Sequence, residues 1–326
     1  MRRKIILILL ATALLFSAIA LGVYINYRHI PKELIEYKSS DRWGADAHSH
    51  LVAYMPESSG FTVLAYAKTV AEIKGKYQGD SKDVSESVYS ASAESAQTLT
   101  SLDAKRSSNT IATLYTDSYF VFHPIKLKEG AYPMATDTVL IDELAAWQLF
   151  GTDKGVVGME IKIGSDIYGV CGVTEVPKGI YTEVYGDKPR VYINADSAAF
   201  RKNVGDRSFT VFEAMIPEPI TNYAKNTVSE LMGSFNAVIY NLDERFNGES
   251  LEELRENKNK LITDVNEIKY PYNEKAMLIL ALKATGVYGA FRVLVLIPAV
   301  LVFAVVLLLI KPVMGLFEKA YKKFKF

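Results

Sequence analysis

Two histidines and an aspartate lie close together in the segment Asp46–His50, whose sequence is DAHSH. An Asp-x-His-x-His string can supply the first ligands of a zinc hydrolase, because carboxylate and imidazole groups both bind zinc. Such a site needs at least three protein ligands and a position for the attacking water. The chain has four histidines, His29, His48, His50 and His123, and no later His and Asp pattern completes the set. The sequence therefore predicts no metal centre, although an adventitious metal site or a pH-sensitive site remains an alternative.

The same stretch alternates polar and apolar residues, which is typical of a β-strand. On such a strand one face would carry His48, His50, Val52 and Tyr54, and the other Ser49, Leu51 and Ala53. We expect the histidine face to lie at the surface or against a partner. This interpretation is favoured over a catalytic one.

Other catalytic patterns are also absent from the sequence. It has neither a Gly-x-Ser-x-Gly nucleophile motif nor a Walker A string, so ATP hydrolysis by that chemistry is not expected. The single cysteine, Cys171, excludes an intrachain disulfide and is interpreted as a small core residue in an apolar strand. Asp142 is interpreted as a helix cap and Glu143 as a first-turn charge. We therefore predict a protein that is not an enzyme and binds no cofactor.

Two apolar segments are long enough to cross a hydrocarbon layer about 30 Å thick. Residues 5–25 carry no charge, and residues 293–310 form a second uncharged run. A cleaved signal peptide ending at the small residues 18–20 is the alternative for the first segment, but the apolar run continues beyond that site and favours a membrane anchor. Both outer flanks are basic, so the positive-inside rule predicts cytoplasmic termini and an extracytoplasmic centre.

Charge is distributed unevenly along the chain, although 37 basic and 37 acidic residues give a formal net charge of zero. Basic residues concentrate at the two ends, which leaves the central region acidic. A nucleic-acid-binding surface would normally be basic, so no nucleic-acid partner is expected.

Periodicity in the central region predicts an α+β fold with two lobes. Strand–helix–strand patterns near both ends of this region predict a split, porter-like lobe, into which a β-rich lobe is inserted. The predicted order is a membrane helix in 1–28, the porter-like lobe in 29–118 and 204–248, the inserted lobe in 119–203, a helical stalk in 249–287, a second membrane helix in 288–311 and a cytoplasmic tail in 312–326.

The tail has one apolar helical face opposite its lysines. This face comprises Val313, Leu316, Phe317, Tyr321 and Phe324, together with Ala320. A basic amphipathic helix of this kind usually lies in the headgroup region of a bilayer. Docking of the same face against a cytoplasmic partner is the alternative.

Between residues 126 and 173 the sequence carries an ordered set of short motifs. The residues of this set are Gly130, Tyr132, Val139, Ile141, Glu143, Leu144, Ala145, Leu149, Phe150, Gly151, Val157, Gly158, Ile161, Val170, Gly172 and Val173. In this order they resemble the MacB-like periplasmic core domain of ABC-transporter permeases of the FtsX type. The flanking strand–helix–strand units resemble the other, porter-like lobe of that family.

The resemblance implies a non-catalytic membrane subunit of an ABC-type export or mechanotransmission complex in the bacterial plasma membrane. Its implied partners are an ABC ATPase, another permease subunit or a second copy of the chain, and the lipid bilayer. Permeases of this family have four membrane helices, so a chain with two is expected to be a shortened form. The alternative function is a stand-alone membrane-anchored module for extracytoplasmic binding, adhesion or signalling.

Overall fold

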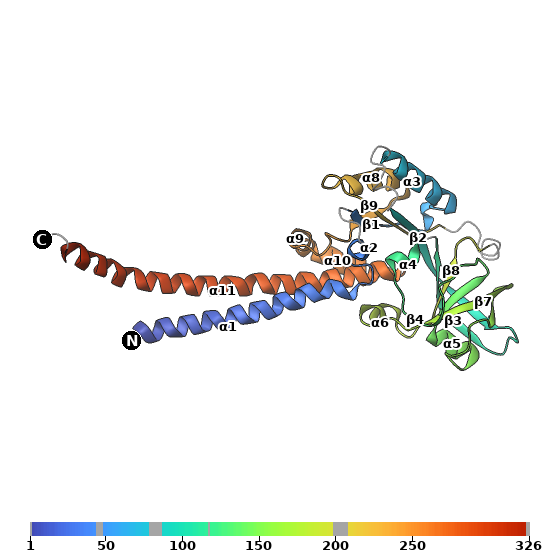
Figure 1. The fold of residues 1–326 in the computed structure, drawn as a ribbon, viewed down its shortest axis with the longest axis horizontal. Coiled ribbons are helices and arrows are strands. Elements are labelled where there is room, and N and C mark those ends of the chain that lie inside the picture. The colour runs from blue at the N-terminus through green and yellow to red at the C-terminus, as the bar shows by residue number, and fades with distance from the viewer. Residues whose placement is uncertain (1, 44–47, 78–86, 117, 198–207, 324–326) are drawn as a thin grey trace. The chain divides into compact units, whose positions relative to one another are not determined.

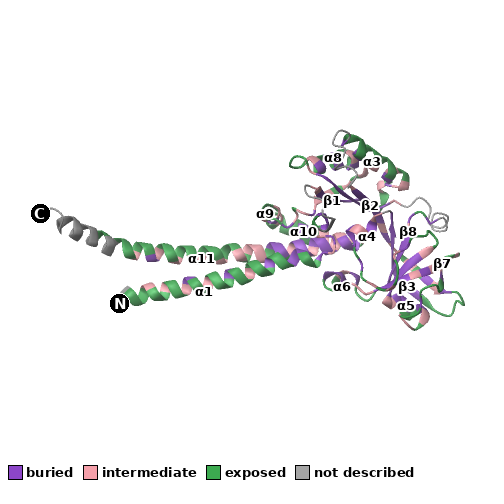
Figure 2. Ribbon diagram, viewed as in Figure 1, coloured by how far each residue is buried: buried purple, intermediate pink, exposed green. Residues whose placement is uncertain are grey.

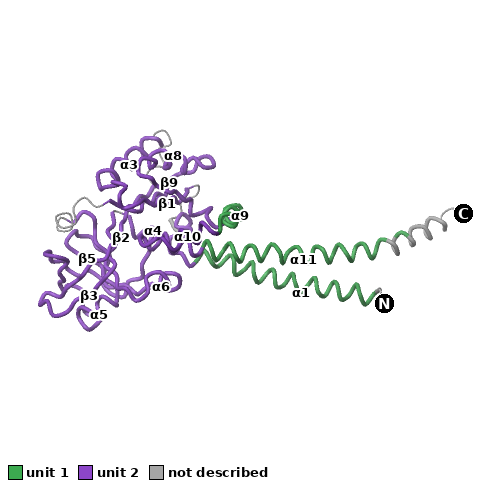
Figure 3. The backbone as a smooth tube through the Cα atoms, turned by 180° about the vertical axis from the view of Figure 1, so that it is seen from behind, with its two compact units in different colours: residues 1–32, 248–258, 281–326 green, residues 33–247, 259–280 purple. Residues whose placement is uncertain are grey.

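The computed structural model describes residues 2–43, 48–77, 87–116, 118–197 and 208–323 (Figure 1). The chain divides into two compact units (Figure 3). The first, here called the helical unit, contains residues 1–32, 248–258 and 281–326. The second, here called the globular unit, contains residues 33–247 and 259–280.

The helical unit is built from α1 (Arg2–His29), α9 (Gly248–Glu256) and the greater part of α11 (Tyr272–Lys323). Both predicted membrane segments are helices long and apolar enough to span a bilayer, as expected from their composition. In its most apolar stretch the first helix is only 11% buried, and the second helix is only 6% buried. The apolar side chains of both helices therefore remain exposed (Figure 2). Such exposure is typical of a lipid-facing surface.

One mixed sheet organises the globular unit. Among the described residues ten strands join it, with the order β10-β1-β9-β2-β3-β8-β5-β7-β4, and β6 pairs with β2 and β7. The strands are β1 (His48–Tyr54), β2 (Val88–Ser101), β3 (Ser107–Tyr115), β4 (Leu127–Gly130), β5 (Thr138–Asp142), β6 (Glu160–Ile163), β7 (Asp166–Thr174), β8 (Arg190–Asn194), β9 (Val211–Pro217) and β10 (Val238–Asn241).

The long strand β2 belongs to both predicted lobes. Its first part, from Val88 to Ser92, pairs with β9 of the porter-like lobe. Its later part pairs with β3 and β6. The α+β prediction is confirmed, and β2 joins the strands of the two predicted lobes into one sheet.

Helices cover this sheet and connect its strands. The remaining helices are α2 (Ser39–Trp43), α3 (Val63–Lys76), α4 (Tyr119–Phe122), α5 (Glu143–Phe150), α6 (Ile180–Tyr185), α8 (Tyr223–Met232) and α10 (Lys258–Glu267), and short 3-10 turns are formed by Ile30–Glu33, Glu57–Ser59 and Gly233–Phe235. The predicted stalk begins as two helices, α9 and α10, rather than one. The break lies at Asn257, whose backbone N–H and side-chain amide both donate to the carbonyl of Glu253.

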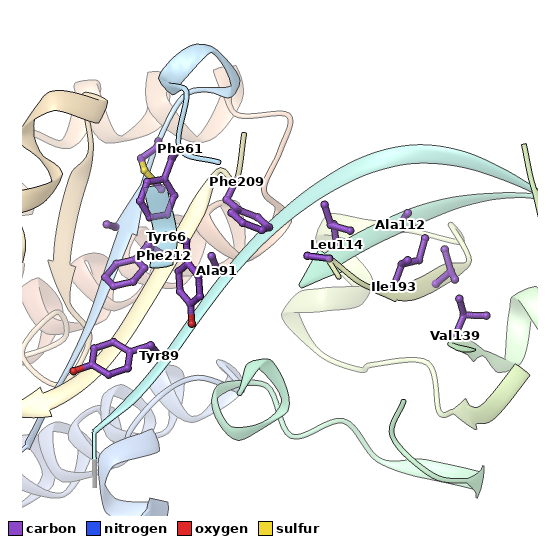
Figure 4. Close-up of a cluster of buried hydrophobic side chains, with 14 of the residues drawn as sticks. Phe61, Tyr66, Tyr89, Ala91, Ala112, Leu114, Val139, Ile193, Phe209 and Phe212 are labelled. Carbon is purple, nitrogen blue, oxygen red and sulfur yellow. The ribbon is translucent and has the colours of Figure 1, made fainter. Parts of the chain in front are cut away.

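Aromatic side chains fill the core of the porter-like lobe (Figure 4). Phe61 makes edge contacts with Phe209 and Phe212, with ring centroids 6.5 and 5.8 Å apart. Phe212 and Ala214 of β9 belong to this core, whereas Met215 belongs to a second cluster with Phe122. Since side chains alternate along a strand, the residue between Phe212 and Ala214 lies on the same face as Met215. That residue is a glutamate.

Candidate functional site

Glu213, which is 1% exposed, lies at the centre of a buried ionic cluster. Its Oε2 atom lies 2.6 Å from Nε2 of His123, the residue that ends α4. Its Oε1 atom lies 3.2 Å from Nε2 of His50 on the neighbouring strand β1. Both carboxylate oxygens therefore have a histidine partner, as a buried charge requires.

The cluster extends to the segment that follows α1. Nδ1 of His123 lies 2.9 Å from Oε1 of Glu36, and Nδ1 of His50 lies 2.6 Å from the hydroxyl of Ser39. Five residues, each at most 4% exposed, form what is here called the histidine network: Glu36, Ser39, His50, His123 and Glu213. The network therefore holds residues 36–39 against the sheet of the globular unit.

Two pKa shifts describe the charge state of the network. Burial alone would lower the pKa of His123, but the carboxylates of Glu213 and Glu36 outweigh it and raise this pKa to about 10. Burial alone would likewise raise the pKa of Glu213, but His123 and His50 lower it to about 2. His123 is thus a cation and Glu213 an anion at neutral pH. A general acid or base works best with a pKa near 7, so this pair is suited to holding structure rather than to transferring protons.

The histidines of the DAHSH string do not lie where the alternation pattern placed them. The prediction of a surface-facing or partner-facing strand is wrong for His50, which is 0% exposed and stacks on Phe122 with ring centroids 4.8 Å apart. The reason is that both faces of β1 are covered, since every residue from Ser49 to Tyr54 is buried, and Phe122 of α4 packs on the face that carries His50. Asp46 lies outside the described residues. Within the described ranges, no three His, Cys, Asp or Glu side chains are grouped to hold a metal ion.

A second buried cluster surrounds the first residue of α11. Glu94 of β2 accepts a hydrogen bond from the backbone N–H of Tyr272 at 2.5 Å and another from the hydroxyl of Tyr185 on α6. Burial raises the pKa of Glu94, while the hydrogen bonds from Tyr185 and Tyr272 act in the opposite direction. The start of α11 is therefore tied to the sheet through a buried carboxyl group.

Helix α6 contacts both attachment points. The hydroxyl of Tyr181 donates to Oε2 of Glu36 at 2.5 Å and accepts from the backbone N–H of Ile35 at 3.2 Å. Tyr185, one turn later, binds Glu94. The two buried tyrosines of one short helix thus reach the segment after α1 and the first residue of α11.

The site residues predicted in the tail remain predictions. The backbone of α11 is helical to Lys323, and it includes Val313, Leu316, Phe317 and Tyr321. Their side chains, and Phe324 altogether, lie outside what the structure describes.

Two local interpretations of the inserted lobe are confirmed. Asp142 is the N-cap of α5, and its Oδ1 accepts from the N–H of Ala145 at 2.8 Å. Glu143 lies in the first turn of that helix, as expected. Cys171 is partly buried and its thiol donates to the carbonyl of Val139.

The periodicity of the sequence did not predict the roles of Glu36, Glu94, Glu213 and the pair of tyrosines on α6. One signal was present for Glu213, since the run FTVFEAMI places a single carboxylate inside an otherwise apolar strand. A charge in such a strand needs a buried partner. The identity of that partner is not encoded in the strand itself.

One comparison with known proteins shows a family. The family model of the MacB-like periplasmic core domain matches residues 43–228. No curated protein matches the chain. The periplasmic region of MacB from Actinobacillus actinomycetemcomitans is similar in structure, with 14% identity, 68% of this chain and 98% of that chain covered, and a TM-score of 0.46. The extracellular domain of the ABC-type transporter YknZ from Gram-positive bacteria is also similar, with 16% identity, 58% and 92% covered, and a TM-score of 0.39.

Proposed function

The chain belongs to the family of MacB-like periplasmic core domains of ABC-transporter permease-type proteins, and we propose that it is a non-catalytic membrane subunit of an ABC-type export or mechanotransmission complex. Two apolar helices flank its core domain, as this role requires. The basic residues at both ends support cytoplasmic termini and an extracytoplasmic globular unit.

One observation carries the proposal. Each apolar helix continues into a segment that the globular unit holds through buried polar contacts. These are the ion pair of Glu36 with His123 after α1 and the hydrogen bond from the backbone N–H of Tyr272 in α11 to Glu94. Breaking a buried ion pair by removing one partner costs roughly 3–5 kcal/mol, so the contact at Glu36 resists separation when α1 is displaced. Both contacts suit a domain that must respond to events in the membrane.

The energy source is proposed to be an ABC ATPase on the cytoplasmic side, together with another permease subunit or a second copy of this chain. The apolar face of the tail, with Leu316 and Phe317 at its centre, is the proposed contact for such a partner or for the bilayer surface.

Purification of the affinity-tagged full chain from native membranes in a mild detergent tests this function. Mass spectrometry of the co-purified proteins should identify a protein with a Walker A motif. The double variant Leu316→Glu and Phe317→Glu should lose this protein, because two carboxylates disrupt an apolar contact. Lys322→Arg, on the opposite helical face, should retain it. Recovery of the unmodified chain without any ATPase would contradict the proposal and favour a stand-alone binding module.

A further inference from the structure

We propose that helix α6 is a mechanical coupler, so that a displacement of the segment following α1 is transmitted through Tyr181 and Tyr185 to the first turn of α11. The purpose of this coupling rests on the proposed function. The contacts that make it possible all lie within the globular unit, and none is explained by the need to build the sheet.

The two tyrosines are spaced so that they can act together. Residues four apart lie on the same face of a helix, and the rings of Tyr181 and Tyr185 have centroids 6.4 Å apart. One hydroxyl binds Glu36 and the other binds Glu94. These carboxylates belong to segments separated by 58 positions in the chain, so the tyrosine pair provides a short connection that the backbone does not.

A cation lies against both rings. The guanidinium carbon of Arg190 lies 3.3 Å from the ring centroid of Tyr185 and 6.0 Å from that of Tyr181. A guanidinium at these distances attracts the ring faces. The backbone N–H of Arg190 donates to Asp142 at 2.9 Å, which anchors the residue to the cap of α5. Movement of either ring is therefore transmitted to Arg190, which contacts both rings and is anchored through its backbone.

Helix α6 and the residues just after it contact α11 directly. The rings of Tyr185 and Tyr272 have centroids 4.4 Å apart, and the ammonium group of Lys188 donates to the hydroxyl of Tyr272 at 2.9 Å. Tyr272 is thus held by its backbone through Glu94 and by its side chain through residues at the end of α6 and just beyond it. The first residue of the helix cannot move without disturbing α6.

A pocket open to solvent lies at the other end of the coupler. It has a volume of about 260 Å³, and Glu33, Ile35 and Tyr181 are among the residues that line it. On the protein side, Tyr181 holds the segment after α1 through its hydrogen bonds to Glu36 and Ile35.

Hydrogen exchange measured by NMR or mass spectrometry on the full chain in detergent tests the coupling. Tyr181→Phe removes one hydroxyl and should lower the amide protection of its neighbour Ile35 by roughly tenfold. This is the factor expected when a hydrogen bond to a charged group is lost and the segment opens more often. The same substitution should also lower the protection of the distant amide of Tyr272, by a factor of the same order. Tyr185→Phe should produce the reciprocal effect at Ile35.

Tyr168→Phe is the matched control, because it also removes a buried hydroxyl, one that accepts from Ser197 in the inserted lobe. It should leave the amides of Ile35 and Tyr272 unchanged. The amide of Val52 on β1 should keep its protection in all variants, which separates coupling from global unfolding. Should Tyr181→Phe fail to fold, the Tyr185→Phe measurement decides alone.

The proposal is overturned if each substitution affects only the amide beside it. The measurement requires no ATPase and no partner chain. It can therefore fail while the co-purification experiment succeeds, and it can succeed while that experiment fails.

Discussion

Replacing His123 by glutamine should destabilise the globular unit severely. The substitution removes a buried cation from between two carboxylates, whose oxygens lie 2.6 Å and 2.9 Å from its ring nitrogens. The amide of glutamine has two N–H donors but no charge, so it cannot offset the charges of Glu36 and Glu213. Removing one partner of a buried ion pair costs roughly 3–5 kcal/mol, so the free energy of unfolding should fall by about that amount.

Thermal unfolding of the full chain in detergent, followed by circular dichroism, measures this loss. For a domain of 150–250 residues about 1 kcal/mol corresponds to roughly 2–4 °C, so the midpoint should fall by roughly 6–20 °C. His29→Gln, at the exposed C-terminal end of α1, makes the same chemical change outside the network and should stay within about 0.5 kcal/mol of the unmodified chain.

The double variant His123→Gln and Glu213→Gln tests the reason for the loss. Neutralising Glu213 removes one of the uncompensated charges, so the double variant should lose less stability than the two single losses added together, by roughly 1–3 kcal/mol. The reasoning would be refuted by a midpoint shift below about 2 °C for His123→Gln. If the stability losses of the two single variants simply added up in the double variant, the reasoning would be refuted equally. Additive losses would mean that the two side chains do not stabilise each other.

Two further predictions concern pH and a close backbone contact. The pKa of His123 is raised from 6.5 to about 10, so the folded state keeps a proton that the unfolded chain loses. The stabilising contribution of His123 should be fully present below pH 6.5 and should be lost between pH 6.5 and about 10. In urea titrations, the difference in free energy of unfolding between the unmodified chain and His123→Gln should shrink over that range. Gly130→Ala should destabilise far more than Gly155→Ala in the same titrations, because both positions have positive φ but only a Cβ at Gly130 would overlap the carbonyl oxygen of Cys171. Equal losses for the two glycine variants would show that the backbone conformation, rather than the close approach, sets the cost.

The sequence by itself determined the features that depend on neighbouring residues. The length and apolarity of residues 5–25 and 293–310 identify helices long enough for a bilayer, because span length follows from the rise per residue. The helix of residues 63–76 and the hairpin of β6 and β7 follow from periodicity and turn residues. Asp142 was identifiable as a cap because its partner, the N–H of Ala145, lies three residues away.

Only the tertiary structure decided which buried charges meet. Glu213 lies 163 positions from His50 and 90 from His123, and Tyr181 lies 145 positions from Glu36. These pairings depend on the strand order β10-β1-β9-β2 and on where α6 lies against the sheet. Alternation along a strand tells which side chains share a face, but it does not tell whether another layer covers that face. His50 was therefore placed at the surface from its pattern, whereas the neighbouring strand β9 and helix α4 enclose it.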